Sequence, residues 1–435
     1  MKFHSSMGKK AYKRRVVITG YGMITPSGRN AADTFNSCSQ GKSGINHITA
    51  FDATGLPCQI AGQVNDKWIS DDGFTHRRLL KFSSRGLKLM SIAVREAAFH
   101  AELPTVSDRQ RIGVQIGSFG EDPSLEEVVW LHQFYDGEGH WDLEGLAREG
   151  GYNFLRFYRR KPDMVSAVIA RLFDCRGPNL SSTSACAAGA QAIGEAFRII
   201  QDGQCDVMIA GGCESTLNLV GILGFVLLGA VTTRYETPQT ASRPFDRKRN
   251  GFVLSEGAGA LVLEDFEHAS HRGAPIQGEI LGYGSSSDAY RITDSDPRGD
   301  GAILAMGKAI SDAGLSPEKI QYINAHGTST LKNDISETRA IDAVFGPNAK
   351  KIPVSSNKSM LGHCIAAAGP IELILTLMGI HRSLILPTIN QTHPDPKCDL
   401  WLVPNQAVRE AHSVAICNSF GFGGQNGCLC IGKPR

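Results

Sequence analysis

One cysteine and two histidines are the residues of this chain whose surroundings favour chemistry. Cys186 lies in Ser-Thr-Ser-Ala-Cys-Ala-Ala-Gly, His326 in Asn-Ala-His-Gly-Thr-Ser-Thr, and His363 in Ser-Met-Leu-Gly-His. A thiolate can take an acyl group and release it to a second nucleophile. Imidazole N–H groups can stabilise negative charge that develops on a thioester oxygen. The three settings together predict carbon–carbon bond formation from thioesters.

Cys186 lies between a polar, strand-like stretch and the helix-like residues 187–202. A cysteine at a helix N-terminus feels unpaired N–H groups and the positive end of the helix dipole, so we expect a lowered thiol pKa. A buried cysteine is more often structural. The strand–turn–helix setting and the two histidines favour a nucleophile.

His326 follows the predicted strand 320–325, at the sheet edge where α/β proteins bind ligands. The stretch 418–427, Asn-Ser-Phe-Gly-Phe-Gly-Gly-Gln-Asn-Gly, follows another apolar strand. It is not a dinucleotide-binding loop, because no long helix and no distal ribose-binding acid follow it. We interpret it as a flexible turn that brings backbone N–H groups and an aromatic ring to the site.

Strands and helices alternate along the chain, which favours parallel or mixed sheets covered by helices. Short apolar runs that end at glycine or polar residues predict strands at 15–22, 112–117, 207–212, 259–264, 320–325 and 414–417. Helical periodicity predicts helices at 87–101, 187–202, 301–314 and 335–345. Each side of a seam at 265–278 opens with a strand that leads to glycine, a similarity that permits a duplicated fold.

Composition excludes several classes of protein. The 435 residues are 42% hydrophobic with a formal net charge of +2, so neither nucleic-acid nor membrane binding is expected. The apolar run 217–231 is too short to cross a bilayer. Residues 1–14 are expected to form a flexible basic extension, because no apolar signal region follows the basic residues. The eleven scattered cysteines predict a reducing, cytoplasmic location.

On these motifs the chain resembles the elongating type I/II β-ketoacyl-acyl carrier protein synthases, within the thiolase-like condensing enzymes, from about Lys13 to Ile431. The resemblance implies an α/β, thiolase-like duplicated five-layer α-β-α-β-α fold. Its N-terminal ketosynthase half would span residues 15–270 and contain the cysteine and an aromatic-rich insertion at 121–161. Its C-terminal half would span residues 271–435 and contain both histidines and the glycine-rich gate loop.

The resemblance also assigns roles to individual residues. Cys186 would accept the acyl group, and His326 and His363 would promote malonyl decarboxylation and stabilise the enolate. Lys358 would order the polar network near His363. The N–H groups of Cys186 and Phe422 would form the oxyanion hole, with Phe422 as the gate. The other matching positions are the substrate contacts Thr328, Thr330 and Phe420 and the acids Glu337 and Glu372, which would be structural or network partners.

The implied partner is an acyl carrier protein whose phosphopantetheine carries the substrates, with no cofactor bound by the enzyme and no metal. A homodimer is expected, and a heterodimer with a ketosynthase-like subunit is the alternative. Carrier proteins are acidic, so basic residues are the docking candidates. They are Arg77, Arg78, Lys81, Arg159, Arg160 and Lys161.

The predicted reaction is decarboxylative Claisen condensation of an acyl thioester with malonyl-carrier protein, in fatty-acid or polyketide elongation. The alternative is the ketosynthase subunit of a specialised type II polyketide synthase, paired with a chain-length-factor-like protein. A silent partner subunit and a coenzyme A-dependent thiolase or starter enzyme are less consistent with the motifs. The chain departs from the family at Leu331, where proline is expected, at Gln425, where threonine is usual, and in the longer segment 121–161.

Overall fold

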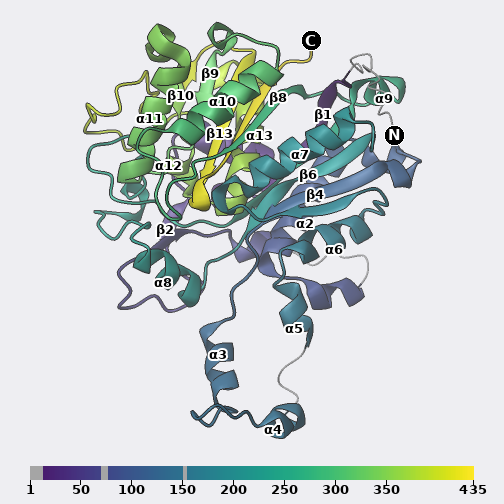
Figure 1. The fold of residues 1–435 in the computed structure, drawn as a ribbon, viewed down its shortest axis with the longest axis vertical. Coiled ribbons are helices and arrows are strands. Elements are labelled where there is room, and N and C mark those ends of the chain that lie inside the picture. Colours follow the sequence, from purple (N-terminus) through teal and green to yellow (C-terminus); the bar gives the residue numbers. More distant parts are fainter. Residues whose placement is uncertain (1–12, 70–76, 150–153) are drawn as a thin grey trace, which may run out of the picture.

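The computed structural model describes residues 13–69, 77–149 and 154–435 (Figure 1). Ten strands form one sheet in the order β10-β9-β13-β14-β8-β1-β7-β6-β4-β5. The strands of the first half are β1 (Val16–Ile24), β4 (Ile112–Ser118), β5 (Asn179–Ser182), β6 (Val207–Glu214) and β7 (Gly257–Asp265). Those of the second are β8 (Gly278–Ser287), β9 (Tyr322–Asn324), β10 (Val354–Ser355), β13 (Val414–Gly421) and β14 (Gln425–Gly432).

The two halves of the sheet repeat one topology. In each half the first strand pairs antiparallel with the last, and the last pairs antiparallel with the fourth. The fourth strand is parallel to the second, and the second to the third. A short antiparallel contact between Val16–Ile18 of β1 and Gly278–Ile280 of β8 joins the halves. The duplication expected from the sequence is therefore present in the strand order.

Helices cover and separate the two halves in five layers. Helices α2 (Arg85–His100) and α6 (Asp163–Leu172) pack outside the first half, and α10 (Asp300–Asp312) and α11 (Leu331–Phe345) outside the second. Between the halves lie α7 (Ala188–Gln201) and α13 (Ala368–Arg382), which contact strands of both. The residues of α13 from Ala368 to Ile380 are all buried, as expected for a helix that is packed on every side.

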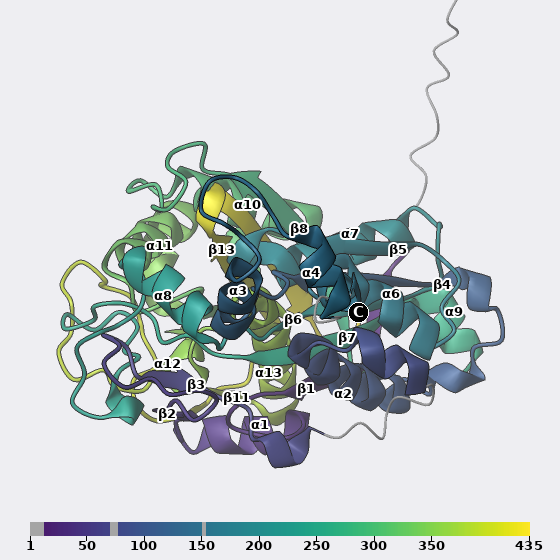
Figure 2. The same ribbon diagram turned by 90° about the horizontal axis from the view of Figure 1, so that it is seen from below.

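Smaller elements complete the fold, and the views in Figures 1 and 2 place them around the five layers. They are α1 (Ala31–Ser39), β2 (Ile45–His47), β3 (Ile60–Gly62), α3 (Leu125–His132), α4 (Leu143–Arg148), α5 (Phe154–Arg159), α8 (Leu219–Leu227), α9 (Phe266–His271), α12 (Lys358–Leu361), β11 (Leu384–Ile385) and β12 (Val408–Arg409). The predicted domain boundary after residue 270 lies in α9, between the last strand of the first half and the first strand of the second.

The predicted strands and helices are confirmed, with shifts at their ends. Two shifts of four residues are the largest. Strand β13 continues to Gly421, into the stretch that was interpreted as a turn, and α11 begins at Leu331 rather than at residue 335. The first turn of this helix, Leu331-Lys-Asn-Asp, is largely polar, so it does not show the apolar periodicity on which the prediction depends. Among the described residues, one helical segment, Ile365–Arg382, is long and apolar enough to span a membrane, and 89% of it is buried within the protein.

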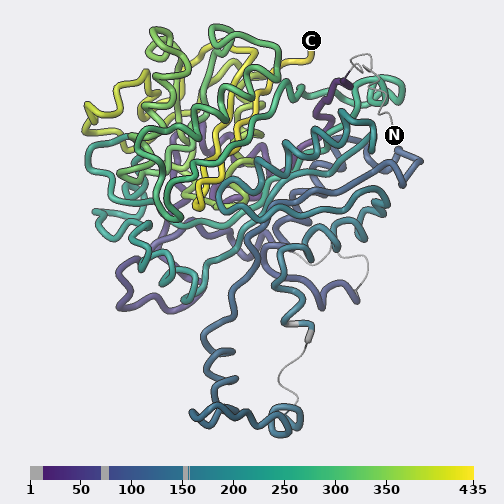
Figure 3. Tube along the Cα trace, in the orientation of Figure 1, coloured from purple at the N-terminus to yellow at the C-terminus, as the bar shows by residue number. Residues whose placement is uncertain are grey.

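The aromatic-rich segment 121–161 forms an arm that projects from the body of the protein (Figures 1 and 3). Its described part contains α3, α4 and α5. Aromatic pairs within the arm stabilise it: the ring centroids of Trp130 and Phe134, and those of Tyr135 and Trp141, are each 5.1 Å apart. Apolar side chains such as Val129 and Leu143 remain exposed. The described part of the arm therefore does not cap the core of this chain.

The predicted basic extension lies mostly outside the described residues, which begin at Lys13. Arg14, the last residue of that predicted extension, is anchored, because its guanidinium lies 2.8 Å from the carboxylate of Asp206.

Candidate active site

Cys186 lies in a tight turn between β5 and α7. The turn is a short 3-10 helix, Ala185–Ala187, and Ala185 has a left-handed φ of 47°. Gly189, one turn into α7, lets α13 approach closely, because a Cβ at this position would lie 2.3 Å from the carbonyl oxygen of Ala366. The cysteine is 3% exposed. The small residues around Cys186 thus allow the two central helices to meet beside the sulfur.

His363 precedes a second turn of the same design. Here the 3-10 helix is Ile365–Ala367, Ile365 has a φ of 41°, and α13 follows directly. Aligning the two turns on their left-handed residues places Ala366 at the position of Cys186 and His363 at that of Thr183. The second half of the molecule therefore contributes His363 from just before the turn that corresponds to the turn holding Cys186.

The structure brings Cys186, His326 and His363 into one cavity. Donor atoms of the three side chains all lie within 4.8 Å of one another. The two imidazole rings meet edge to face, with centroids 5.3 Å apart. The cavity has a volume of about 240 Å³, and the predicted substrate contacts Thr328, Thr330 and Phe420 and the gate Phe422 also line it. A nucleophile and two neutral hydrogen-bonding rings thus surround one small space.

Buried acids position the backbone around His326. The Glu337 carboxylate accepts hydrogen bonds from the N–H groups of His326 and Gly327, each at 2.8 Å. Asn418 on β13 donates to the same carboxylate at 3.1 Å. Glu337 does not line the cavity. These hydrogen bonds place Glu337 behind His326, and its role in the network stays a prediction.

Both imidazoles are neutral at physiological pH. Burial lowers the pKa of His326 well below 6.5, and the positive charge of Lys358 and the His363 ring lower it further. Burial and Lys358 also lower the pKa of His363. Neutral rings can donate an N–H to a developing oxyanion and can accept a proton at the other nitrogen. Within the described structure, neither ring nitrogen of His363 has a hydrogen-bond partner.

Lys358 and Glu372 form a buried ion pair behind the cavity. The Lys358 Nζ lies 2.6 Å from Glu372 Oε1, and the side chains are 2% and 3% exposed. Burial raises the pKa of Glu372 to about 7, and Lys358 opposes that rise. Lys358 does not line the cavity, although its charge acts on both imidazoles and on the thiol. The structure thus places Lys358 as a positioning and electrostatic residue rather than in contact with a substrate.

The expectation of a lowered thiol pKa is wrong for the resting structure. Burial raises the pKa of Cys186 to about 12, and it outweighs the opposing effects of Lys358 and of the Phe422 N–H group, which hydrogen-bonds to the sulfur. The helix dipole acts here on a thiol that has lost its hydration, so the neutral form is favoured. The thiol must therefore lose its proton as the acyl group arrives. The Phe422 N–H contacts the sulfur in this state, and its role in the oxyanion hole stays a prediction.

Backbone geometry fixes the two threonines and the gate. The hydroxyl oxygens of Thr328 and Thr330 are 2.9 Å apart, and Ser329 between them has a left-handed φ of 71°. The Ser329 carbonyl accepts a hydrogen bond from Gly251 at 3.0 Å. Phe422 begins the short 3-10 turn Phe422–Gly424. Both glycines of that turn have left-handed φ values, so the gate lies on backbone that favours glycine.

The predicted docking residues form a separate region at the base of the arm. The 3-10 helix Arg77–Phe82 contacts α5, and Arg78, Lys81 and Lys161 are exposed. The Arg77 side chain lies outside the described residues. Arg160 is ion-paired with Glu127, and Arg159 is partly buried. None of the five described side chains lines the cavity that contains Cys186. Their role in docking stays a prediction.

Sequence reasoning missed Phe252 and Glu214. Phe252 packs edge to face on His363, with ring centroids 5.1 Å apart, and lines the cavity. It follows Gly251, whose φ of 144° brings its backbone against Val231. Glu214 ends β6 and is fully buried, where its carboxyl accepts hydrogen bonds from Ser215 and Thr216. An acid directly after an apolar strand was the available signal for Glu214.

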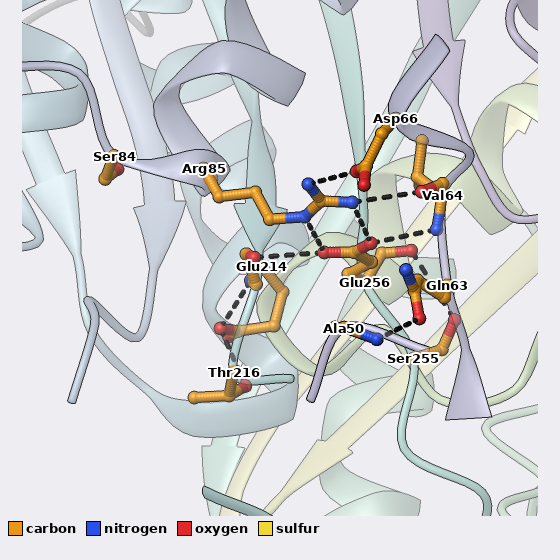
Figure 4. Close-up of polar contacts among 12 residues, drawn as sticks. Ala50, Gln63, Val64, Asp66, Ser84, Arg85, Glu214, Thr216, Ser255 and Glu256 are labelled. Carbon is orange, nitrogen blue, oxygen red and sulfur yellow. Dashed lines mark hydrogen bonds and ion pairs between the residues drawn. The ribbon is translucent and has the colours of Figure 1, made fainter. Parts of the chain in front are cut away.

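A second buried polar cluster lies beside Glu214 and ties α2 to the first half of the sheet (Figure 4). The guanidinium of Arg85 makes two hydrogen bonds to Glu256, at 2.7 and 2.8 Å, and a third to Asp66 at 2.6 Å. Glu256 also accepts from the Ser215 hydroxyl at 3.0 Å. Ser215 therefore links this cluster to Glu214, whose carboxyl accepts from the Ser215 N–H.

We expect Glu214 to make the folded state less stable as pH rises from about 4.5 to about 8. Burial raises its pKa from 4.5 to about 8, so the folded state favours the protonated acid. The stabilising contribution of this group is complete below pH 4.5 and is lost as pH rises through about 8. Thermal melts at pH 5 and pH 8 should show a smaller loss of melting temperature for Glu214→Gln, which mimics the neutral acid, than for the native chain. Equal losses would contradict this assignment.

The layered duplicated fold and a cysteine facing two histidines define a thiolase-like condensing enzyme. The sequence profile of the β-ketoacyl synthase N-terminal domain matches residues 13–269, and that of the C-terminal domain matches residues 277–392. The chain therefore belongs to the β-ketoacyl synthase family, whose members are acyltransferases that form carbon–carbon bonds.

Relatives and solved structures agree with this assignment. The chain is 39% identical to a 3-oxoacyl-[acyl-carrier-protein] synthase 2 of Coxiella burnetii, over 97% of this chain and 99% of the relative. It is 40% identical to the enzyme of the same name from Synechocystis sp., over 97% of this chain and 98% of that relative. A β-ketoacyl synthase from Burkholderia phymatum superposes with a TM-score of 0.85 at 31% identity, covering 97% and 100%. A type II polyketide ketosynthase was solved with its acyl-carrier protein and bound to a hexaketide. It superposes with a TM-score of 0.83 at 32% identity, covering 97% of this chain and 100% of that chain.

Proposed function

We propose that this enzyme elongates acyl chains by decarboxylative condensation with malonyl-acyl carrier protein. The observation that carries the proposal is the single cavity in which the Cys186 thiol faces two neutral imidazoles. The names of the relatives support an acyl-carrier-protein substrate. The pantetheine arm would enter past Thr328 and Thr330, and the thioester carbonyl would lie between Phe422 and Cys186.

The first half-reaction transfers the acyl group to Cys186. The sulfur attacks the thioester carbon and an S–C bond forms, while the N–H groups of Cys186 and Phe422 stabilise the oxyanion. The bond from carbon to the pantetheine sulfur then breaks. The Cys186 proton moves to the departing pantetheine thiolate. The His363 ring, whose nitrogens have no hydrogen-bond partner within the described structure, can transfer the proton from the one sulfur to the other. The high thiol pKa makes this proton transfer part of the step.

The second half-reaction uses the histidines as hydrogen-bond donors. The malonyl carboxylate leaves as carbon dioxide, and its bonding electrons pass into an enolate whose oxygen accepts N–H donation from His326 and His363. The enolate carbon attacks the acyl carbon on Cys186, a carbon–carbon bond forms, and the cysteine sulfur leaves. Lys358 would keep both rings neutral by its charge, because a protonated ring beside it is disfavoured.

A stepwise experiment tests this function. The enzyme is first incubated with an acyl-carrier protein, and the acyl group on Cys186 is detected by mass spectrometry. Malonyl-carrier protein is then supplied. We expect the acyl group to leave the enzyme and a carrier-bound 3-oxoacyl product longer by one two-carbon unit to appear with carbon dioxide. Stable acylation without chain extension would contradict the proposal.

We further propose that the enzyme works as a dimer, either with a second copy or with a ketosynthase-like subunit. β5 ends the sheet, and among the described strands none pairs with its outer edge. The projecting arm exposes apolar side chains that a partner would cover. One similar structure, 32% identical with a TM-score of 0.84, is described as the ishigamide ketosynthase/chain length factor. Light scattering of the purified chain should give twice its 46.8 kDa mass if a second copy is the partner.

We also propose a cytoplasmic location. All eleven cysteines are free thiols, and most are buried in the core. Free thiols in this number are typical of proteins from reducing compartments. Fractionation of the source cells with an antibody against the chain should recover it with soluble cytoplasmic enzymes.

A further inference from the structure

A short extended segment, residues 253–255, holds the backbone of His363. The His363 N–H donates to the Val253 carbonyl at 2.7 Å, and the Ser255 N–H donates to the His363 carbonyl at 3.0 Å. Gly362 permits this close approach, because it has a left-handed φ of 72° and a Cβ there would lie 2.9 Å from the Ser255 Cβ. Neither ring nitrogen of His363 has a hydrogen-bond partner within the described structure. The position of the ring therefore depends on the position of this backbone.

Glu256 directly follows the segment and fixes it to the first half of the sheet. Its side chain is fully buried, and its carboxylate accepts two hydrogen bonds from the Arg85 guanidinium, at 2.7 and 2.8 Å (Figure 4). The same carboxylate accepts from the Val64 N–H at 2.8 Å and from the Ser215 hydroxyl at 3.0 Å. The Glu256 N–H donates to the Gly62 carbonyl at 3.0 Å. These contacts tie the segment to α2, to β3 and to the end of β6.

Arg85 supplies the positive charge that balances this buried carboxylate. Two N–H groups of one guanidinium that bind both oxygens of one carboxylate fix the distance and the orientation of the pair. A buried carboxylate that loses its cation is strongly disfavoured, so it takes up a proton or moves toward water. Either change would shift the segment that precedes Glu256. Neither Arg85 nor Glu256 lines the cavity, so an effect of these residues on the reaction must pass through another residue.

We propose that Arg85 and Glu256 are positioning residues for His363, and that they hold residues 253–255 where the imidazole faces the enolate oxygen. This inference rests on the proposed function, because it explains how one of the two enolate donors is held in place. An oxyanion donor stabilises charge without reorganisation only when it is already in position. A misplacement of about 1 Å in such a site can slow a reaction by about 100-fold.

The two histidines provide an internal comparison. The His326 N–H donates to Glu337 on α11, whereas His363 is bonded to residues 253–255. A change at Arg85 should therefore act on the reaction through His363 and not through His326.

Arg85→Met and Arg85→Lys test the proposal in double-mutant cycles with each histidine. Methionine removes the charge, and lysine keeps it but cannot bind both oxygens as a fork. With malonyl-carrier protein, we expect Arg85→Met to lower kcat for decarboxylation by about tenfold and Arg85→Lys by about threefold, with KM within about twofold. In a His363→Ala chain the same changes should cost less than about twofold, because the donor that they position is gone. In a His326→Ala chain the full loss should remain. Release of labelled carbon dioxide measures all of these rates.

Arg272→Met and Arg272→Lys are the matched controls. Arg272 makes the same double contact with the fully buried Glu264, at 2.6 and 2.7 Å, near the opposite end of β7 from Glu256. We expect these controls to lower the melting temperature and to leave kcat within about twofold of the native value.

Equal fold-losses from the Arg85 substitutions in the native, His363→Ala and His326→Ala chains would overturn the proposal, because the pair would then support only the fold. Native kcat in both Arg85 variants would also overturn it. Arg85→Lys keeps a cation beside Glu256 and completes the cycle if the Arg85→Met chain does not fold. A native chain that released no carbon dioxide from malonyl-carrier protein would contradict the proposed function itself, whereas equal losses in an active enzyme would leave that function intact.

Discussion

Cys186→Ala is expected to abolish chain extension while malonyl decarboxylation continues at a measurable rate. The methyl group cannot hold an acyl chain, so the condensing step loses its electrophile. Both imidazoles and the Phe422 N–H remain in the cavity, so the enolate oxygen keeps its donors. Release of labelled carbon dioxide from malonyl-carrier protein and mass spectrometry of the carrier-bound products measure the two activities separately.

Cys38→Ala is the control for this substitution. Cys38 is also a buried free thiol, but it belongs to the core near α1 and does not line the cavity. Its loss should leave extension and decarboxylation close to native values. Full extension by Cys186→Ala would be incompatible with the proposed mechanism, because no other thiol lines the described cavity.

Replacing either histidine by alanine is expected to slow decarboxylation by about 10²–10³-fold, or roughly 3–4 kcal/mol in the barrier, as for the loss of one oxyanion donor. The effect should be large because the site is buried and water cannot easily replace the missing N–H. Acylation of Cys186 should survive in His326→Ala, whose ring is not needed for the first half-reaction. Rapid-quench acylation and carbon dioxide release distinguish the two steps.

His412→Ala provides a matched control, since His412 is a buried imidazole whose Nε2 has no hydrogen-bond partner within the described structure. It packs on Tyr322, outside the cavity. We expect it to affect stability and not the ratio of the two half-reactions. Native decarboxylation rates in both His326→Ala and His363→Ala would show that the enolate is stabilised elsewhere.

The sequence allowed the catalytic residues to be predicted because each lies in a short stretch with strong local constraints. Cys186 and His363 precede helices, and His326 follows a strand, so topology alone brings them to one edge of the layered sheet. The direction of the Cys186 pKa shift could not be predicted. It depends on how completely distant segments bury the sulfur, and burial outweighs the helix dipole.

Features that depend on long-range packing also could not be predicted from the sequence. Phe252 carries no motif, and it becomes part of the site only because Gly251 turns its backbone toward Val231. The opening of the cavity combines residues from separate segments of the sequence. The aromatic content of the arm indicated a special segment, but the sequence did not show that its described part projects from the body.

The repeated turn before each central helix has a consequence for stoichiometry. At the position of the nucleophile the second turn has Ala366, a side chain with no reactive atom, and Glu214 accepts a hydrogen bond from its N–H. The N–H at that position is thus satisfied internally by a carboxyl group. Each polypeptide can therefore load a single acyl chain in the described cavity despite its doubled architecture, and the half without the reactive sulfur supplies the imidazole beside it.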